Sequence, residues 1–164
     1  MLYIKKSGLP GSGKGLFTDS FIPKGTKVVE YTGEIITMKE YESRTDDDRY
    51  GYMLYFNKNH CIDAYRRPKA LARYANDAKG LFGKKGLFNN CMYDFYGKRG
   101  YIVAFRNILP HCEILVGYGK EYWDDMRYNI RIDRQRALRK KRKRLEAKAK
   151  AKTKSKIKTK KKRR

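Results

Sequence analysis

Short hydrophobic segments, interrupted by Gly, Pro and Asn, predict a series of short β-strands. Residues 1–6 (MLYIKK) and 15–37 (GLFTDSFIPKGTKVVEYTGEIIT) are rich in β-branched and aromatic residues, and the second run is broken at Gly25 and Gly33. Residues 52–64 (YMLYFNKNHCIDA) alternate as a hairpin does, around a turn at 57–59. Three more strands are expected in 91–97 (CMYDFYG), 100–108 (GYIVAFRNI) and 112–119 (CEILVGYG).

Helical patterns are fewer. Residues 66–77 (RRPKALARYAND) contain good helix formers and place Pro68 in the first turn, so a helix is expected there. The polar run 37–50 (TMKEYESRTDDDRY) is consistent with a short helix or an inserted loop. A further helix is expected from Asp124, with acidic residues at its positive end. The low-complexity residues 148–164 are expected to be disordered until bound.

The charge is concentrated at the C-terminal end. Residues 127–164 hold 21 of the 41 Lys and Arg residues and only two of the 17 acidic residues, a net charge of +19 out of +24. This composition predicts a folded domain over residues 1–126 and a basic extension over 127–164 that cannot build a core. Clustered cations release counterions from nucleic acid, which is the expected partner of the tail. A tail that only increases solubility is the alternative.

The cysteines and the N-terminal residues bear on the cellular location. Cys61, Cys91 and Cys112 lie far apart without a C-x-x-C pair, so neither a zinc site nor a disulfide framework is expected. Residues 1–15 contain no apolar run of the kind found in signal peptides, and no stretch approaches the ~18 apolar residues of a membrane helix. We expect an intracellular protein with reduced thiols, in the nucleus or on chromatin or a nucleoid if the tail binds nucleic acid.

Residues 8–15 (GLPGSGKG) nearly match a phosphate-binding P-loop. Gly15 stands where that motif needs a Ser or Thr, and the β-like residues that follow cannot form the helix that holds phosphate. The motif is therefore read as a loop whose backbone approaches a ligand closely.

Four blocks in order resemble the SET domain of protein lysine methyltransferases. They are residues 11–37, 72–78 (ARYANDA), 89–94 (NNCMYD) and 113–119 (EILVGYG). The chain looks most similar to the histone lysine monomethyltransferase branch that carries an N-C-x-Y-D motif. The resemblance implies a mainly β, β-clip fold of small antiparallel sheets with a pseudoknot and short helices. It also implies S-adenosylmethionine as cofactor, S-adenosylhomocysteine as product, and a lysine side chain as methyl acceptor.

The same resemblance assigns the cofactor-binding residues. Asn76 and the residue after it hold the cofactor in the family, and the backbone of Lys14 and Gly15 lies along its methionine end. Asp77 departs from the His that is usual in the family. The contact at that position is largely through backbone, so Asp77 is retained as a cofactor-binding residue, although its charge is expected to weaken binding. The alternative is that Asn76 and Asp77 only cap a helix.

Tyrosines are the expected catalytic residues. Tyr118 matches the catalytic tyrosine of the family and is also expected beside the cofactor, Tyr31 matches a wall of the lysine channel, and Tyr93 matches the residue at the far end of that channel. A hydroxyl at Tyr93 would favour monomethylation, since Val116 has none to replace it. Each could instead be an ordinary strand residue. Trp123 is expected to pack on the cofactor or the substrate, or else to anchor the C-terminal helix.

Together these patterns predict an S-adenosylmethionine-dependent protein lysine N-methyltransferase. The expected substrate is a histone or another basic protein associated with nucleic acid, and the expected product is mainly monomethyllysine. The alternative function is a SET-like adaptor that binds nucleic acid or chromatin and has lost turnover through Asp77.

Overall fold

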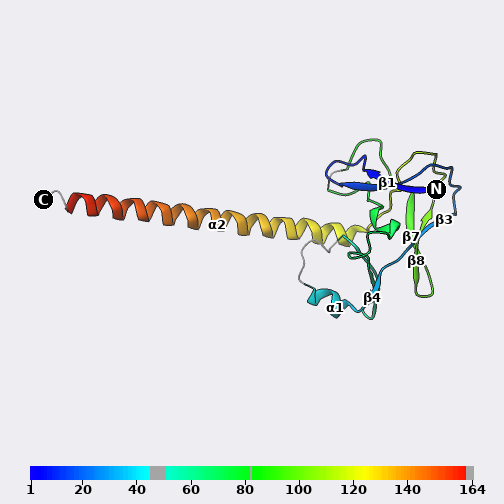
Figure 1. The fold of residues 1–164 in the computed structure, drawn as a ribbon, viewed down its shortest axis with the longest axis horizontal. Helices are drawn as coiled ribbons and strands as arrows, with labels where there is room; N and C mark the ends of the chain where they lie inside the picture. Colours follow the sequence, from blue (N-terminus) through cyan, green and yellow to red (C-terminus); the bar gives the residue numbers. More distant parts are fainter. Residues whose placement is uncertain (45–50, 82, 162–164) are drawn as a thin grey trace. The chain divides into compact units, whose positions relative to one another are not determined.

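The computed structural model describes residues 1–44, 51–81 and 83–161, and it divides into two units, Met1–Tyr118 and Gly119–Arg164. The described strands all belong to the first unit and form small antiparallel sheets (Figure 1). The short helices of that unit lie between strands, and the second unit contains one long helix. The predicted class, small antiparallel sheets with short helices and a C-terminal helix, is confirmed.

Three sheets make up the first unit. In the first sheet, β1 (Leu2–Lys6) pairs with β2 (Lys14–Thr18). The second has the order β3 (Lys27–Tyr31), β8 (Arg99–Ala104), β7 (Cys91–Tyr96), and the third has the order β4 (Glu34–Ile36), β6 (His60–Asp63), β5 (Met53–Asn57). The predicted hairpin at 57–59 is confirmed: the Asn59 N–H donates to Oδ1 of Asn57 over 2.9 Å.

The largest hydrophobic cluster of the described residues contains residues from all three sheets. Its fully buried side chains come from β2, from β8 and from the segment before Tyr118, and they include Leu16, Ile102, Ile114 and Val116. Since these residues are far apart in sequence, the core depends on long-range pairing rather than on any one local element.

The polar run after β4 forms the helix α1 (Met38–Ser43), whose N-terminus has a complete capping box between Thr37 and Glu40. After the helix, Arg44 donates to Glu34 over 2.7 Å and to the buried Asp63 over 2.8 Å. These bonds fix the end of α1 to β4 and β6. The rest of the predicted helix or loop, 45–50, lies outside the described residues.

The helix predicted over 66–77 is much shorter than expected. Only the four-residue 3₁₀ helix η2 (Leu71–Tyr74) forms, and the preceding residues make separate i to i+3 turns. The reason is tertiary: Asn76 forms a parallel bridge with Leu115, which requires an extended backbone where the helix would have continued.

Residues 112–119 were expected to form a strand, but only isolated bridges occur there. The N–H of Ile114 donates to Leu16, and the N–H of Val116 donates to Asn76. The carbonyl of Leu115 accepts from the neighbouring N–H groups of residues 90 and 91. Because each residue bonds to a different segment, no continuous ladder forms, and the segment instead ties those parts of the chain together.

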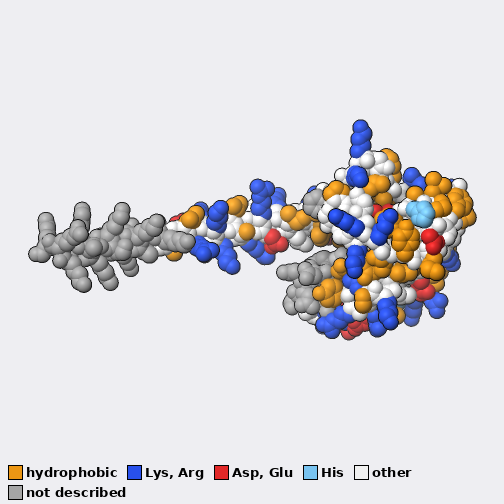
Figure 2. Space-filling view, turned by 45° about the horizontal axis from the view of Figure 1, so that its top comes forward, with side chains coloured by type: hydrophobic (Ala, Val, Ile, Leu, Met, Phe, Trp, Pro, Cys, Tyr) orange, Lys and Arg blue, Asp and Glu red, His pale blue; other side chains and the backbone are white. Residues whose placement is uncertain are grey.

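The second unit contains α2 (Lys120–Lys161). The helix begins four residues before the predicted start and continues through most of the segment expected to be disordered, because Lys, Arg and Ala are strong helix formers. Lys and Arg side chains project from more than one side of its described part (Figure 2). None of the helices in the described residues is long and apolar enough to span a membrane. The domain boundary at residue 126 stays a prediction.

Candidate active site

Residues 75–77 contact two of the other predicted site residues, Lys14 and Tyr118. The extended backbone here accepts a 2.8 Å hydrogen bond from Val116 through the carbonyl of Asn76. On the other side, Nδ2 of Asn76 donates to the carbonyl of Lys14 over 3.0 Å. Two predicted cofactor-binding residues, Lys14 on β2 and Asn76 after η2, are therefore in direct contact.

Glu113 is the buried acid that holds this junction together. Its side chain is 7% exposed and accepts from Ser7 Oγ over 2.6 Å, from the Gly8 N–H over 2.9 Å and from Asn76 Nδ2 over 3.2 Å. The sequence pattern gave no indication of a role for Glu113. These bonds join the loop after β1 to the segment before Tyr118.

Gly15 lies directly against this acid. A Cβ built on Gly15 would overlap the Glu113 carboxylate, which its hydrogen bonds hold in place. From the sequence, the Gly15 backbone was expected to lie along the cofactor. The overlap with Glu113 gives this glycine a structural reason that is independent of any ligand. Its predicted cofactor contact through backbone stays a prediction.

The side-chain carboxylate of Asp77 accepts hydrogen bonds from neighbouring segments. The residue is 6% exposed, and Oδ1 accepts from the Lys79 N–H and from Nδ2 of Asn89, both over 2.8 Å. Oδ2 accepts from the backbone N–H of Tyr118, also over 2.8 Å. The carboxylate therefore bonds to three N–H donors, a role that the sequence, with its departure from His, did not suggest.

Tyr118 is held at two points by the same short segment. Besides its N–H bond to Asp77, its hydroxyl donates to the carbonyl of Ala75 over 2.7 Å. The side chain is half-buried against the core. The position of the ring is therefore fixed relative to Asn76, which lies between the two residues that bind Tyr118.

Tyr31 and Tyr93 are brought together by β3 and β7. Their rings meet edge to face, with centroids 6.1 Å apart, and the Tyr31 hydroxyl donates to the carbonyl of Tyr52 over 2.9 Å. Tyr31 is 3% exposed, whereas Tyr93 is half-buried. Tyr31 belongs to the buried core cluster, and Tyr93 and Tyr118 pack against that cluster. Val116 is fully buried.

Two asparagines of the block 89–94 support the site, although the motifs in the sequence assign them no role. Asn90 donates to the Glu113 carbonyl over 2.7 Å and accepts from the Leu115 N–H over 2.9 Å. Asn89 accepts from the Ala78 N–H over 2.8 Å while it donates to Asp77. The signal that could have found them is a pair of amides immediately before the buried Cys91, a position where side chains replace missing backbone partners.

Burial raises the pKa of the Cys91 thiol to about 12, so the thiol stays protonated near neutral pH.

Trp123 lies in the second unit, on α2. Its ring packs edge to face against the Tyr122 ring, with the two ring centroids 4.9 Å apart. Its predicted cofactor contact stays a prediction.

The P-loop interpretation is excluded by the fold. Lys14 and Gly15 begin the strand β2, whereas a P-loop must open a helix.

Comparison with known proteins identifies the family of the first unit. The SET domain family matches residues 13–119. The chain is 30% identical over 123 residues to N-lysine methyltransferase KMT5A-A of Danio rerio, covering 68% of this chain and 33% of that protein. It is 31% identical over 128 residues to N-lysine methyltransferase KMT5A-B of Xenopus laevis, covering 71% and 36% respectively. The chain thus spans about a third of the length of these relatives. Because the matched residues contain the whole junction of Lys14, Asn76, Asp77 and Tyr118, the chain belongs to the SET domain family.

Proposed function

We propose that the chain is an S-adenosylmethionine-dependent protein lysine N-methyltransferase. The proposal rests on one observation. Ala75 and Asp77 hold Tyr118 by hydrogen bonds, and the side chain of Asn76, the residue between them, contacts Lys14. Relatives with matching sequence are named N-lysine methyltransferases.

The residues around Asn76 fit a polar cofactor. Oδ1 of Asn76 accepts no hydrogen bond within the part of the chain that the structure describes, although its Nδ2 is fully engaged. This oxygen of the half-buried Asn76 and the backbone of Lys14 and Gly15 provide acceptors and donors for a charged amino-acid group. We infer that Asn76, Asp77, Lys14 and Gly15 hold S-adenosylmethionine, with Trp123 as a further contact. When bound, the cofactor supplies a methyl group on a sulfonium, and S-adenosylhomocysteine is the product.

The aromatic residues suit the second requirement of the reaction, a neutral amine in a fixed direction. A lysine has a pKa near ~10.4 in water, and desolvation lowers it because the charged form loses hydration. The rings of Tyr31 and Tyr93 provide such an apolar wall. Tyr118 orients the reacting groups, and alignment alone contributes much of the acceleration in a direct displacement.

Methyl transfer can be tested with labelled S-adenosylmethionine on histones, ribosomal proteins and the enzyme itself, with product sites located by mass spectrometry. Lysine-specific labelling whose rate falls about tenfold or more in Tyr118→Phe supports the proposal. Cofactor binding without labelled lysine in any of these proteins would contradict it and favour the adaptor function.

The substrate that we propose is a histone or another basic protein associated with nucleic acid, and the product is mainly monomethyllysine. Tyr93→Phe is expected to increase the di- and trimethyllysine fractions about tenfold. Removing the hydroxyl frees space for a methylated amine to turn, and one hydrogen bond of about 1–3 kcal/mol is enough to change a rate this much. Mass spectrometry of a methylated peptide at early times measures the fractions.

Tyr55→Phe is the matched control for this change, because Tyr55 is 52% exposed on β5. Abundant trimethyllysine from the unmutated enzyme would contradict the role of Tyr93.

We also propose that α2 binds nucleic acid and places the protein in the nucleus or on chromatin. Deleting residues 140–164 is expected to weaken binding to duplex DNA and to reduce its salt dependence by about 0.9 log unit for each phosphate that the protein no longer neutralises. Methylation of a short peptide should not change. Fluorescence anisotropy at several salt concentrations measures the slope.

Replacement of the exposed Lys84 and Lys85 by Ala removes cations from the first unit and serves as the control for the tail deletion. An unchanged slope after the deletion would show that the tail is not the electrostatic anchor.

A further inference from the structure

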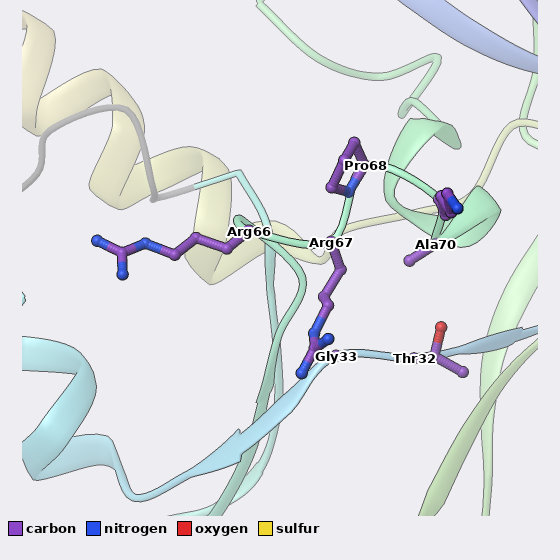
Figure 3. A pocket seen from close by; sticks show the side chains of 7 residues that line it. Thr32, Gly33, Arg66, Arg67, Pro68 and Ala70 are labelled. Atoms are coloured by element: carbon purple, nitrogen blue, oxygen red, sulfur yellow. The ribbon is translucent and has the colours of Figure 1, made fainter.

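A pocket of about 490 Å³ lies beside the segment that follows Tyr31. Thr32 and Gly33 border it on one side, and the turn at 66–70 borders it on the other (Figure 3). Gly33 is required here, because a Cβ would come within 2.5 Å of the Asp63 carbonyl oxygen. The lining residues are Thr32, Gly33, Arg66, Arg67, Pro68, Lys69 and Ala70.

The pocket is strongly cationic. Arg66, Arg67 and Lys69 line it together with no acidic residue, and all three are exposed. Within residues 1–44, 51–81 and 83–147, none of them forms an ion pair with an acid. The Arg67 side chain extends across toward Gly33, whereas the Arg66 side chain points away from it (Figure 3). Arg67 is therefore the cation best placed to bind a group inside the pocket.

Backbone hydrogen bonds connect this pocket to the tyrosines of the site. The carbonyl of Tyr52 accepts both the Tyr31 hydroxyl and the Ala64 N–H, each over 2.9 Å. Ala64 in turn accepts the N–H of Arg67 over 3.0 Å. One carbonyl thus fixes a wall of the proposed lysine channel and the start of the turn that carries the cations. A group bound in the pocket would lie next to a lysine entering beside Tyr31.

The surroundings favour a polypeptide over a nucleic acid as the occupant. Thr32 and Gly33 join β3 and β4, and each of these strands lies at the edge of its sheet in the described structure. Edge strands present backbone N–H and C=O groups that pair with an extended peptide, whereas phosphates can use only the donors.

We propose that this pocket binds an acidic side chain, Asp or Glu, of the protein substrate a few residues from the lysine to be methylated. The proposal rests on the lysine methyltransferase function for the choice of the target residue. Arg67 donates to the carboxylate, since a guanidinium matches its planar geometry, and Lys69 adds a second cation.

Isomeric peptides separate this site from general attraction to a basic protein. Each fluorescein-labelled peptide contains one Lys and one Glu in a neutral background, and only the position of the Glu relative to the Lys changes. All isomers carry the same charge, so attraction to α2 is equal for all. Binding is measured by anisotropy and turnover by mass spectrometry, for the wild type, for Arg67→Glu and for the control Lys98→Glu. Lys98 is an exposed residue in the β7–β8 turn, so the control makes the same charge change away from the pocket.

The wild type is expected to bind one isomer about tenfold more tightly than the others, the effect of one charge-assisted hydrogen bond. Arg67→Glu should abolish this preference and favour peptides with Arg in place of that Glu, while Lys98→Glu should keep the wild-type preference. Equal binding of all isomers, or an unchanged preference in Arg67→Glu, would overturn the proposal. Loss of DNA binding in Arg67→Glu with the peptide preference intact would identify a phosphate site and would also overturn it. Selective binding without methylation of any isomer would count against the enzymatic function and support the pocket.

Discussion

Replacing Tyr118 with Phe is expected to lower kcat by about 10- to 100-fold while cofactor affinity changes only a few-fold. The hydroxyl donates to Ala75 over 2.7 Å, and this bond sets the direction of the ring beside Asn76. Loss of one such bond is worth about 1–3 kcal/mol, and ~1.4 kcal/mol corresponds to a tenfold change in rate. The ring itself remains in Phe, so packing against the core should be preserved.

Single-turnover methyl transfer and calorimetric cofactor titration separate the two effects of this substitution. Tyr55→Phe removes a hydroxyl from an exposed strand residue and should leave both quantities unchanged. A Tyr118→Phe rate near that of the wild type would remove Tyr118 from the catalytic role.

Replacing Asp77 with Ala is expected to lower the free energy of unfolding by at least about 3 kcal/mol, because each buried donor left without a partner costs about 1–3 kcal/mol. The carboxylate accepts from the Lys79 N–H, from Asn89 and from the Tyr118 N–H. Alanine supplies none of these acceptors. Urea denaturation measures the change, and Asp125→Ala, at an exposed acid on α2, is the control.

Asp77→Asn distinguishes positioning of Tyr118 from general stability. The amide oxygen can keep the bonds to Lys79 and Asn89, but the amide nitrogen then faces the Tyr118 N–H, which is also a donor. We expect a fall in kcat with little change in KM for the peptide. Near wild-type stability of Asp77→Ala together with an unchanged kcat in Asp77→Asn would show that the carboxylate is dispensable.

The strands could be predicted from the sequence because alternation and turn residues are local signals. The hairpin at 57–59 and the presence of strands at β7 and β8 follow directly from such patterns, although β8 ends at Ala104, four residues before the predicted end. The helix at 66–77 was overestimated because the bridge between Asn76 and Leu115, which extends the backbone, is made by residues far apart in sequence.

The site was predictable only as far as the family motifs reach. Those motifs predict Asn76, Tyr31 and Tyr93 as site residues, and the structure brings the two tyrosines together. They gave no indication that Glu113 bonds to Ser7, a pair separated by 106 positions, or that the Asp77 side chain binds the Tyr118 backbone. Such polar contacts depend on the three-dimensional fold, and no local sequence pattern around Glu113 or Asp77 predicts the hydrogen-bond partner.

The segment 113–118 also determines when the first unit can fold. Its residues complete hydrogen bonds to Leu16, Asn76 and residues 90 and 91, and its apolar side chains fill the centre of the core. Contacts of such long sequence separation form slowly, because the intervening chain must be ordered first. During synthesis from the N-terminus, the earlier strands therefore lack their contacts with segment 113–118 until Tyr118 has left the ribosome. A chain arrested before residue 113 is expected to be cleaved by protease throughout, whereas one released after α2 resists.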